Sequence, residues 1–472
     1  MRTMKQLCVC ALVTVALFGL RAHAEIKLPA IFSDNMVLQQ QSAVAVWGWA
    51  KPGSGVRVTG SWNGKSYSAR SDSNGRWKVT VQTPSASHTP YTLTVSDGKS
   101  VVLKNILIGE VWICSGQSNM EMQMKGWTNQ PVEGGPEAIA HSSNPDIRCF
   151  TVQKASKAAP QDDCVGSWEV ASPQTVPDFT ATGYFFGRFL NEALDVPVGL
   201  IHTSWGGSRI EAWMTPASLK EIPEKTVPAT DADIKSNNGT ATVLYNGMIH
   251  PLVGYGIRGA IWYQGESNRN EPALYVEMFD KMVREWRRLW DAGDFPFYYC
   301  QIAPYRYGDS HNSARLREAQ ARGMSTTPNT GMAVLMDARS LDCIHPSGKK
   351  DAGERMALWA LAQTYGWGKM HYRSPELKSF EAEGRVAVLT FDYAGSSGLT
   401  SHGREILNFQ VAGKDRRFHP AKAAISGHTV YIFSPAVAEP VAVRYCFDDT
   451  SETEIFTLEG NLPLPSFRTD DW

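Results

Sequence analysis

The hydrophobic pattern of this 472-residue chain changes twice, and its middle section constrains the fold most. Between residues 106 and 373, short apolar runs typical of buried strands alternate with segments whose apolar residues recur at helical spacing. Such alternation predicts a parallel sheet covered by helices on both faces. The expected strands are 106–113, 198–202, 258–263, 297–302 and 332–336, and the expected helical segments are 184–194, 279–290, 314–324 and 347–365.

Both flanks of this section carry a different pattern. Residues 25–105 alternate apolar and polar residues in short runs, separated by dipeptides of tight hairpin turns such as Asn63-Gly64 and Asp97-Gly98. This pattern predicts a small antiparallel β-sandwich. Residues 374–472 return to short β runs, which predicts a second all-β domain. Two polar segments of the central domain, near 129–180 and 222–240, are predicted to be long loop insertions.

The first 24 residues have the pattern of a signal peptide. Arg2 and Lys5 precede an apolar stretch over 7–20, and Ala22-His23-Ala24 is a small-x-small cleavage site. The apolar stretch is short for a membrane span, and no cysteine follows the site to carry a lipid anchor. We expect a protein exported to the periplasm or the extracellular space without a membrane anchor. An uncleaved amino-terminal anchor is the alternative.

Charge and cysteine content exclude several function classes. Lys and Arg number 46 against 47 Asp and Glu, and no basic run is interleaved with aromatic residues, so nucleic acid is not an expected partner. Six cysteines follow the leader, with no CxxC pair and no Cys/His spacing suited to zinc, so no metal site is expected. A Cys149–Cys164 bridge and free buried thiols are the two alternatives for the cysteines.

A serine stands where an esterase would need its nucleophile. The segment Gly116-Gln117-Ser118-Asn119-Met120 directly follows the expected strand 106–113 and precedes a polar segment. A tight turn at this point would hold the Ser118 side chain at the carboxyl edge of the sheet, where open α/β folds bind ligands. Ser118 is therefore the candidate nucleophile, although Gly-x-Ser is by itself a common turn sequence.

A candidate base and carboxylate lie near the end of the central section. A serine hydroxyl needs a base to take its proton, and a carboxylate that orients this base. Asp342 and His345 are three residues apart in a predicted loop after the strand 332–336. One turn at this spacing would place the carboxylate against Nδ1 of the imidazole and leave Nε2 free for Ser118. Pro346 is then expected at the first position of the last helix.

An acyl-transfer site also needs hydrogen-bond donors for the oxyanion of the tetrahedral intermediate. The backbone N–H groups of Ser118 and Gly207 are two candidates, and a side-chain amide, either Gln264 or Asn268, is the third. Glu266 lies between these two amides; a structural role is favoured for it, and a triad carboxylate is the alternative. Further possible supporting residues are the neighbours of the serine, Gln117 and Asn119.

Taken together, these motifs resemble those of the SGNH (GDSL-like) hydrolase superfamily, in its sialate O-acetylesterase family. The similar blocks are Gly116-Gln117-Ser118-Asn119-Met120, Trp205-Gly206-Gly207-Ser208, Trp262-Tyr263-Gln264-Gly265-Glu266-Ser267-Asn268 and Asp342-Cys343-Ile344-His345-Pro346. The resemblance implies a flavodoxin-like, three-layer α/β/α domain with flanking all-β domains, and an activity that needs no cofactor. The wider superfamily has GxND in its third block, which leaves the choice between Gln264 and Asn268 open.

The predicted function is a secreted serine esterase that removes O-acetyl groups from carbohydrates through an acyl-enzyme on Ser118. O-acetylated sialic acids are the favoured substrates by resemblance, and acetyl xylan or another polysaccharide is the alternative, because only pocket contacts would differ. A non-catalytic carbohydrate-binding protein and a metal-dependent deacetylase are the competing classes. The oligomeric state is not predicted by the sequence.

Overall fold

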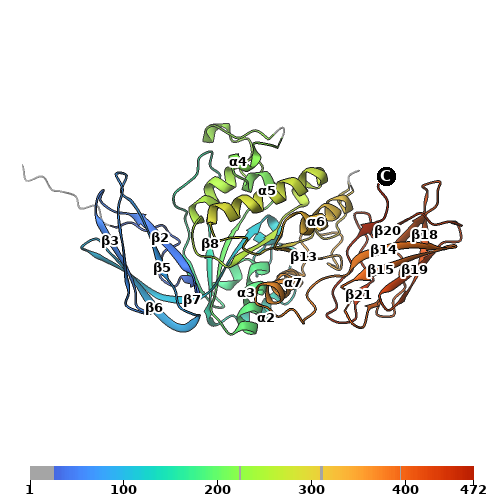
Figure 1. Cartoon of the computed structure of the whole chain (residues 1–472), viewed down its shortest axis with the longest axis horizontal. Coiled ribbons are helices and arrows are strands. Elements are labelled where there is room, and N and C mark those ends of the chain that lie inside the picture. Colours follow the sequence, from blue (N-terminus) through green and yellow to red (C-terminus); the bar gives the residue numbers. More distant parts are fainter. Residues whose placement is uncertain (1–25, 223–224, 309–311, 394) are drawn as a thin grey trace, which may run out of the picture.

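The computed structural model describes residues 26–222, 225–308, 312–393 and 395–472. The chain forms three units in a row, shown in Figure 1 from the blue amino-terminal β-domain through the central α/β domain to the red carboxyl-terminal β-domain. The predicted signal peptide lies outside the described residues. Within the described residues, no helix is long and apolar enough to cross a membrane.

The central sheet has the strand order β13-β12-β11-β7-β10-β8-β9. Adjacent strands are parallel along this order except β8 and β9, which pair antiparallel at one edge. Without β8 and β9, the order is the 2-1-3-4-5 arrangement of flavodoxin-like folds. The predicted fold class is therefore confirmed. The strands are β7 (Ser100–Gly116), β8 (Asn144–Thr151), β9 (Trp168–Ala171), β10 (Val198–Ser204), β11 (Gly259–Tyr263), β12 (Phe297–Cys300) and β13 (Thr330–Ala333).

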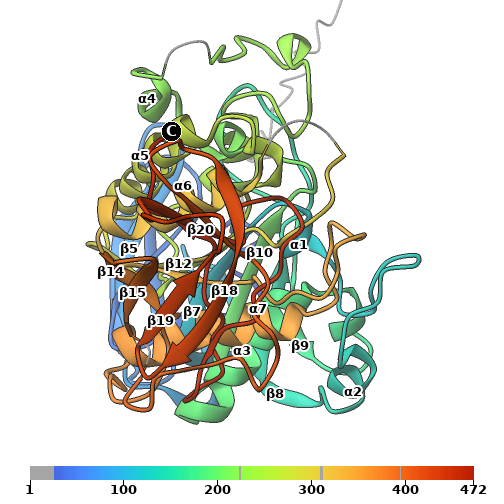
Figure 2. The same cartoon turned by 90° about the vertical axis from the view of Figure 1, so that its right-hand side faces the viewer.

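Helices cover both faces of this sheet. Figures 1 and 2 show α5 and α6 on one side and α3 and α7 on the other. The helices are α1 (Ser118–Glu121), α2 (Gly135–Ala140), α3 (Ala181–Leu194), α4 (Pro216–Leu219), α5 (Pro272–Trp290), α6 (Ala314–Thr326) and α7 (Lys349–Trp359). The sequence explains where α3 begins and ends: the side chain of Thr180 accepts a hydrogen bond from the N–H of Gly183, and Asp195 adopts a left-handed conformation after the last turn.

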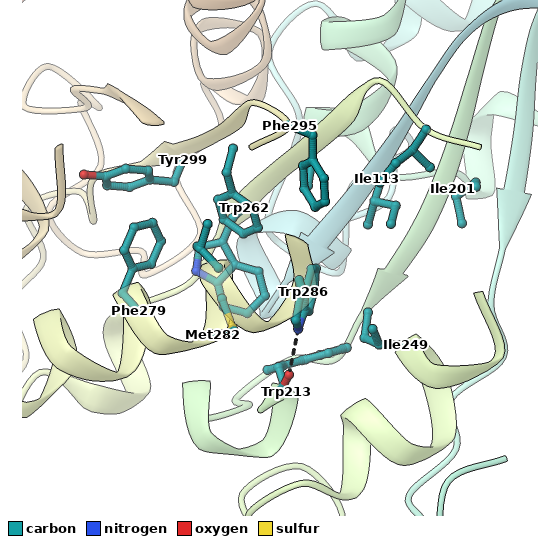
Figure 3. Close-up of a cluster of buried hydrophobic side chains, with 14 of the residues drawn as sticks. Ile113, Ile201, Trp213, Ile249, Trp262, Phe279, Met282, Trp286, Phe295 and Tyr299 are labelled. Carbon is teal, nitrogen blue, oxygen red and sulfur yellow. Dashed lines mark hydrogen bonds between the residues drawn. The ribbon is translucent and has the colours of Figure 1, made fainter. Parts of the chain in front are cut away.

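Aromatic side chains fill the layer between the sheet and α5. Trp262 of β11 packs edge-to-face against Trp286 of α5 and against Trp213, and the indole N–H of Trp286 donates to the carbonyl oxygen of Trp213 at 3.1 Å (Figure 3). All three indoles are fully buried. These tryptophans therefore stabilise the core, since aromatic side chains bury a large apolar area, and they are not accessible to a sugar.

The amino-terminal domain is joined to the central sheet by one long strand. β7 pairs with β6 and β1 in its first half and with β10 and β11 in its second half. The predicted domain boundary at residue 105 thus falls inside a continuous strand, at a residue with positive φ, Asn105 (φ 56°). The other strands of this domain are β1 (Val37–Gln39), β2 (Ala43–Trp49), β3 (Gly55–Gly60), β4 (Ser66–Arg70), β5 (Arg76–Gln82) and β6 (Ser87–Ser96).

A buried carboxylate reinforces this junction. Glu110, in the middle of β7, is fully buried and accepts hydrogen bonds from Arg258 at 2.8 and 3.1 Å, Gln40 at 2.7 Å and Gln39 at 3.2 Å. The hydroxyl of Tyr365 donates to it at 2.8 Å. Because a buried charge is costly unless it is paired, this network ties the amino-terminal domain to the sheet.

The carboxyl-terminal domain is an antiparallel sheet of seven strands, accompanied by the short pair β16 and β21. This agrees with the predicted all-β domain. Its strands are β14 (Glu376–Glu383), β15 (Val386–Asp392), β16 (Leu399–Thr400), β17 (Phe409–Ala412), β18 (Phe418–Ser426), β19 (Thr429–Phe433), β20 (Ala442–Tyr445), β21 (Phe456–Thr457) and β22 (Phe467–Arg468).

Two local predictions need correction, and the structure decides between the two alternatives for the cysteines. The segment 129–180 is not simply a loop, because it contributes α2 and the edge strands β8 and β9. The last helix begins at Lys349 rather than Pro346, with Gly348 as its N-cap, and its final turn widens into a π-helix over Ala360–Thr364. The six cysteines of the described residues are free thiols, which is the second of the two alternatives, so the Cys149–Cys164 bridge is not formed.

Candidate active site

The turn after β7 fixes the candidate nucleophile at the edge of the sheet. Gly116 has φ 140°, and a Cβ there would lie 2.2 Å from the carbonyl oxygen of Tyr263 in β11. Only glycine allows this approach, which is completed by a 2.9 Å hydrogen bond from the Gln117 N–H to the same carbonyl. Ser118 then begins α1 and is 8% exposed. Its hydroxyl makes no hydrogen bond to any described residue.

Ser118 lines a cavity of about 560 Å³ at the carboxyl ends of β7, β10 and β11. The loop after β10 contributes Trp205, Gly206 and Gly207, the loop after β11 contributes Glu266, Ser267 and Arg269, and the loop before α7 contributes Ile344 and His345. The remaining lining residues are Gln117, Glu121, Trp127, Lys154 and Tyr307. Thus Ser118, His345 and Gly207, which are far apart in sequence, lie around one space.

His345 is held by an amide and an aromatic ring. Its Nδ1 lies 2.8 Å from Oε1 of Gln130, and Trp127 contacts the imidazole edge-to-face with ring centroids 5.0 Å apart. If Nδ1 carries the hydrogen and donates it to this amide oxygen, Nε2 is unprotonated and can act as a base. Burial, reinforced by the positive charge of Lys349, lowers the pKa of His345 to about 4, so the imidazole is neutral at neutral pH.

The predicted contact between Asp342 and His345 is corrected by the structure. The Asp342 side chain is 83% exposed and faces Arg306, with 3.6 Å between its carboxylate and the guanidinium Nε. Nδ1 of His345 is occupied by Gln130 instead. A spacing of three residues permits a turn but does not fix the direction of either side chain, so the sequence could not show that Asp342 turns outward.

Sequence reasoning missed Gln130 because it lies in the segment predicted as a loop insertion. The structure shows why it is well placed: Trp127 and Gln130 exchange two backbone hydrogen bonds of 2.9 Å, which form a tight turn. This turn presents both side chains to His345. The only sequence signal was Gly126, whose φ of 76° and close approach to the Gln130 carbonyl suit glycine at the start of the turn.

Two backbone N–H groups at the cavity are free to bind an oxyanion. The N–H groups of Ser118 and Gly207 make no backbone or side-chain hydrogen bond within the described chain, and both residues line the cavity. Gly207 has φ 70°, in the left-handed region that favours glycine. The neighbouring N–H of Gly206 is different, because it donates to the carboxylate of Glu121. The structure therefore brings the two predicted backbone donors to the same cavity as Ser118.

Neither predicted side-chain donor faces this cavity, which is a second correction. Gln264 is fully buried, and its amide nitrogen donates to the Ser208 carbonyl at 3.1 Å and to Oδ1 of Asn268 at 2.8 Å. Asn268 is also fully buried and donates to Glu211 at 3.0 Å. Both amides therefore hold the loop after β11 against the loop after β10, and neither lines the cavity.

Gln117 supplies the amide that does line the cavity. Its Oε1 accepts hydrogen bonds from the backbone N–H groups of Gly265 at 3.3 Å and Ser267 at 3.4 Å. Its Nε2 has no partner among the described residues. Because Oε1 is engaged by the loop, the free Nε2 is the end of the side chain left to donate to a ligand.

Glu266, which lines the cavity, belongs to a buried polar cluster with Asn119 and Lys349. Nδ2 of Asn119 donates to Glu266 at 2.6 Å, and the ammonium of Lys349 donates to Oδ1 of Asn119 at 2.7 Å. Burial raises the pKa of Glu266. The carboxylate of Glu266 is thus bound to Asn119 rather than to His345, as expected for the structural role favoured from the sequence.

Within the part of the chain that the structure describes, no three His, Cys, Asp or Glu side chains are grouped as metal ligands. The acidic residues of the cavity are already engaged by protein groups, Glu121 by Lys154 at 2.6 Å and Glu266 by Asn119.

A family model, curated relatives and a solved structure all match this chain and agree with one another. Residues 108–361 match the family model described as a carbohydrate esterase, sialic acid-specific acetylesterase. The sialate O-acetylesterases of Rattus norvegicus and Homo sapiens are 30% and 29% identical to this chain; each alignment covers 93% of it, and 93% and 92% of the relatives. A crystal structure of a carbohydrate acetylesterase from Xanthomonas citri is 37% identical, with a TM-score of 0.86 over 95% of this chain and 100% of that one. The chain belongs to the sialic acid-specific acetylesterase family of carbohydrate esterases.

Proposed function

We propose that this protein is an exported serine esterase that removes O-acetyl groups from carbohydrates, with O-acetylated sialic acids as substrates. One observation carries the chemistry: Ser118, neutral His345 and the free N–H groups of Ser118 and Gly207 surround one cavity. The family and the names of its relatives support the substrate class. The pattern of the first 24 residues supports export.

In the proposed reaction, the Ser118 hydroxyl attacks the acetyl carbonyl while Nε2 of His345 accepts its proton. The N–H groups of Ser118 and Gly207 donate to the oxyanion, and Nε2 of Gln117 is the third donor. The bond between the acetyl carbon and the sugar oxygen then breaks, and this oxygen takes the proton from the imidazolium and leaves as the free hydroxyl. A water molecule, deprotonated by His345, attacks the acetyl carbon on Ser118. The bond to Oγ breaks, Oγ takes the proton back from the imidazolium, and acetic acid is released. Gln130 holds the imidazole through Nδ1, and Asp342 is the alternative orienting group if it leaves Arg306.

Two tryptophans at the cavity support a sugar substrate. Trp127 and Trp205 are half-buried and line the cavity, and indole rings at a site commonly pack against a pyranose ring. Acetylated xylan remains the alternative substrate, because the acetyl chemistry would be the same and only these contacts would differ.

Acetate release from O-acetylated sialic acid and from acetylated xylan, measured side by side, tests the proposal. We expect faster release from the sialic acid and none from either substrate with Ser118→Ala. Sugar binding without hydrolysis would replace the proposal with a carbohydrate-binding role. Loss of activity on dialysis against a chelator would point to a metal-dependent deacetylase.

A further inference from the structure

Lys349 occupies a position that is costly for a lysine. It is 1% exposed, and burial lowers the pKa of its ammonium to about 7. It is also the first residue of α7, where the helix dipole disfavours a positive charge. A buried cation at a helix amino terminus destabilises a fold unless its hydrogen bonds compensate, so the contacts of this side chain show what it does.

Those contacts lie on both sides of His345. The ammonium of Lys349 donates to the carbonyl oxygen of Pro346 at 2.6 Å and to Oδ1 of Asn119 at 2.7 Å. Nδ2 of Asn119 donates in turn to the carbonyl oxygen of Ile344 at 3.1 Å. The backbone carbonyls of Ile344 and Pro346, the residues before and after His345, are therefore both held by this pair of side chains.

The same pair is fixed relative to the nucleophile. Asn119 follows Ser118 in α1, and its backbone carbonyl accepts a 3.0 Å hydrogen bond from the hydroxyl of Thr182. The carboxylate of Glu266 anchors the amide of Asn119 from the loop after β11. Serine and histidine come from segments more than 200 residues apart, and Asn119 and Lys349 are the direct polar link between them.

We propose that Lys349 is a positioning residue of this esterase: with Asn119 it holds the backbone on both sides of His345 and keeps the imidazole aligned with Ser118. This inference rests on the proposed function. Charged and titratable groups facing the ammonium are Glu266 from the loop after β11, Cys300 from β12 and Cys343 from the loop before α7. The ring of Tyr263 in β11 lies 6.0 Å from the ammonium, and the charge of Lys349 acts on His345.

The test compares Lys349→Met with Lys350→Met. Lys350 is the next residue of α7 and is exposed, which makes it a matched control. We expect Lys349→Met to lose roughly a hundredfold in kcat with KM nearly unchanged, the effect of a small misplacement of a catalytic group. Each kcat is calculated per active site, and the active sites are counted as the serines that react with a fluorophosphonate. We expect Lys350→Met to match the wild type.

The pH profile separates positioning from a merely structural role. Removing the cation removes one cause of the low pKa of His345, so the acid limb of kcat/KM in Lys349→Met should move to higher pH. A variant with a lower melting temperature but wild-type kcat per reactive serine and an unmoved acid limb would overturn the inference. If Lys349→Met does not fold, Lys349→Gln retains a donor without the charge, and the same two readouts apply.

Failure of this inference is distinguishable from failure of the proposed function. An active wild type, an inactive Ser118→Ala and a fully active Lys349→Met would refute only the role of Lys349. A wild type without esterase activity on either acetylated sugar would refute the proposed function, and with it the inference.

Discussion

Replacing Gln130, the residue that contacts Nδ1 of His345, should change the pH below which the enzyme loses activity. In the structure, His345 is paired with the neutral amide of Gln130, and burial and Lys349 lower the pKa of its imidazole to about 4. A histidine with a lowered pKa is deprotonated, and thus active as a base, at every pH above that value. Activity should be lost only as the pH falls through about 4, whereas a free histidine would protonate near 6.5.

The variant Gln130→Glu places a carboxylate 2.8 Å from Nδ1. An opposite charge at this distance favours the protonated imidazole and raises its pKa by about 1 to 3 units, which is about 1.4 to 4 kcal/mol. The acid limb of kcat/KM should therefore shift upward by the same amount. In contrast, Asp342→Asn removes a carboxylate that is 83% exposed and paired with Arg306. A surface ion pair contributes about 0 to 1 kcal/mol, so kcat should change by less than about fivefold.

The assay is acetate release from an acetyl ester, measured from about pH 3 to about pH 8 with wild type and both variants. The reasoning is refuted if Asp342→Asn loses about 10⁴ in kcat, the loss typical of a triad carboxylate, and if the wild-type acid limb lies near 6.5. That result would mean that Asp342 leaves Arg306 and binds Nδ1 in the working enzyme. The sequence-based assignment of Asp342 would then be correct, and the Gln130 contact would belong to the resting conformation.

Three further predictions concern the neighbouring residues. Ser118→Ala should abolish acetyl ester hydrolysis while leaving the thermal melt unchanged, and substantial residual kcat would exclude this serine as the nucleophile. Gln117→Glu keeps an acceptor for the loop but removes the free donor, so kcat should fall roughly a hundredfold. Gln264→Leu should lower mainly the melting temperature. The opposite pattern would return the oxyanion role to Gln264. Gly116→Ala forces a Cβ against Tyr263 and should reduce the free energy of unfolding by at least about 2 kcal/mol, which denaturant titration would measure; an unchanged midpoint would contradict the strained turn.

The order of the central elements and the location of the site could be predicted from the sequence. Parallel strands end at the same edge of a sheet, so the loops after β7, β10 and β11 had to meet, and the polar motifs in those loops had to meet with them. The same rule applied to the loop after β13 brings His345 to this edge with Ser118 and Gly207, without any knowledge of side-chain directions. The edge strands β8 and β9 were missed because their pairing shifts register between Asn144 and Arg148, which leaves little regular alternation to read.

Side-chain partners were beyond the sequence because they depend on rotamers and on distant segments. Gln264 and Asn268 lie in the expected motif, yet both turn into the protein, where Ser208 and Glu211 accept their hydrogen bonds. Gln130 reaches His345 from 215 residues away, in a turn without a motif. The general lesson is physical: spacing along the chain fixes which loops meet, while burial and hydrogen-bond competition fix which atoms face the ligand.

The continuous strand β7 also imposes an order on folding. Its first half can pair at once with β6, which precedes it, but its second half is the centre of the catalytic sheet and must wait for β10 and β11. During this wait, an apolar strand with two unpaired edges remains available for pairing with another chain. Such long-range parallel pairing is slow, because the chain loses the entropy of closing a long loop before the stabilising contacts form. The half-made enzyme is therefore the stage most exposed to aggregation, and expression fragments that end before β11 should be insoluble.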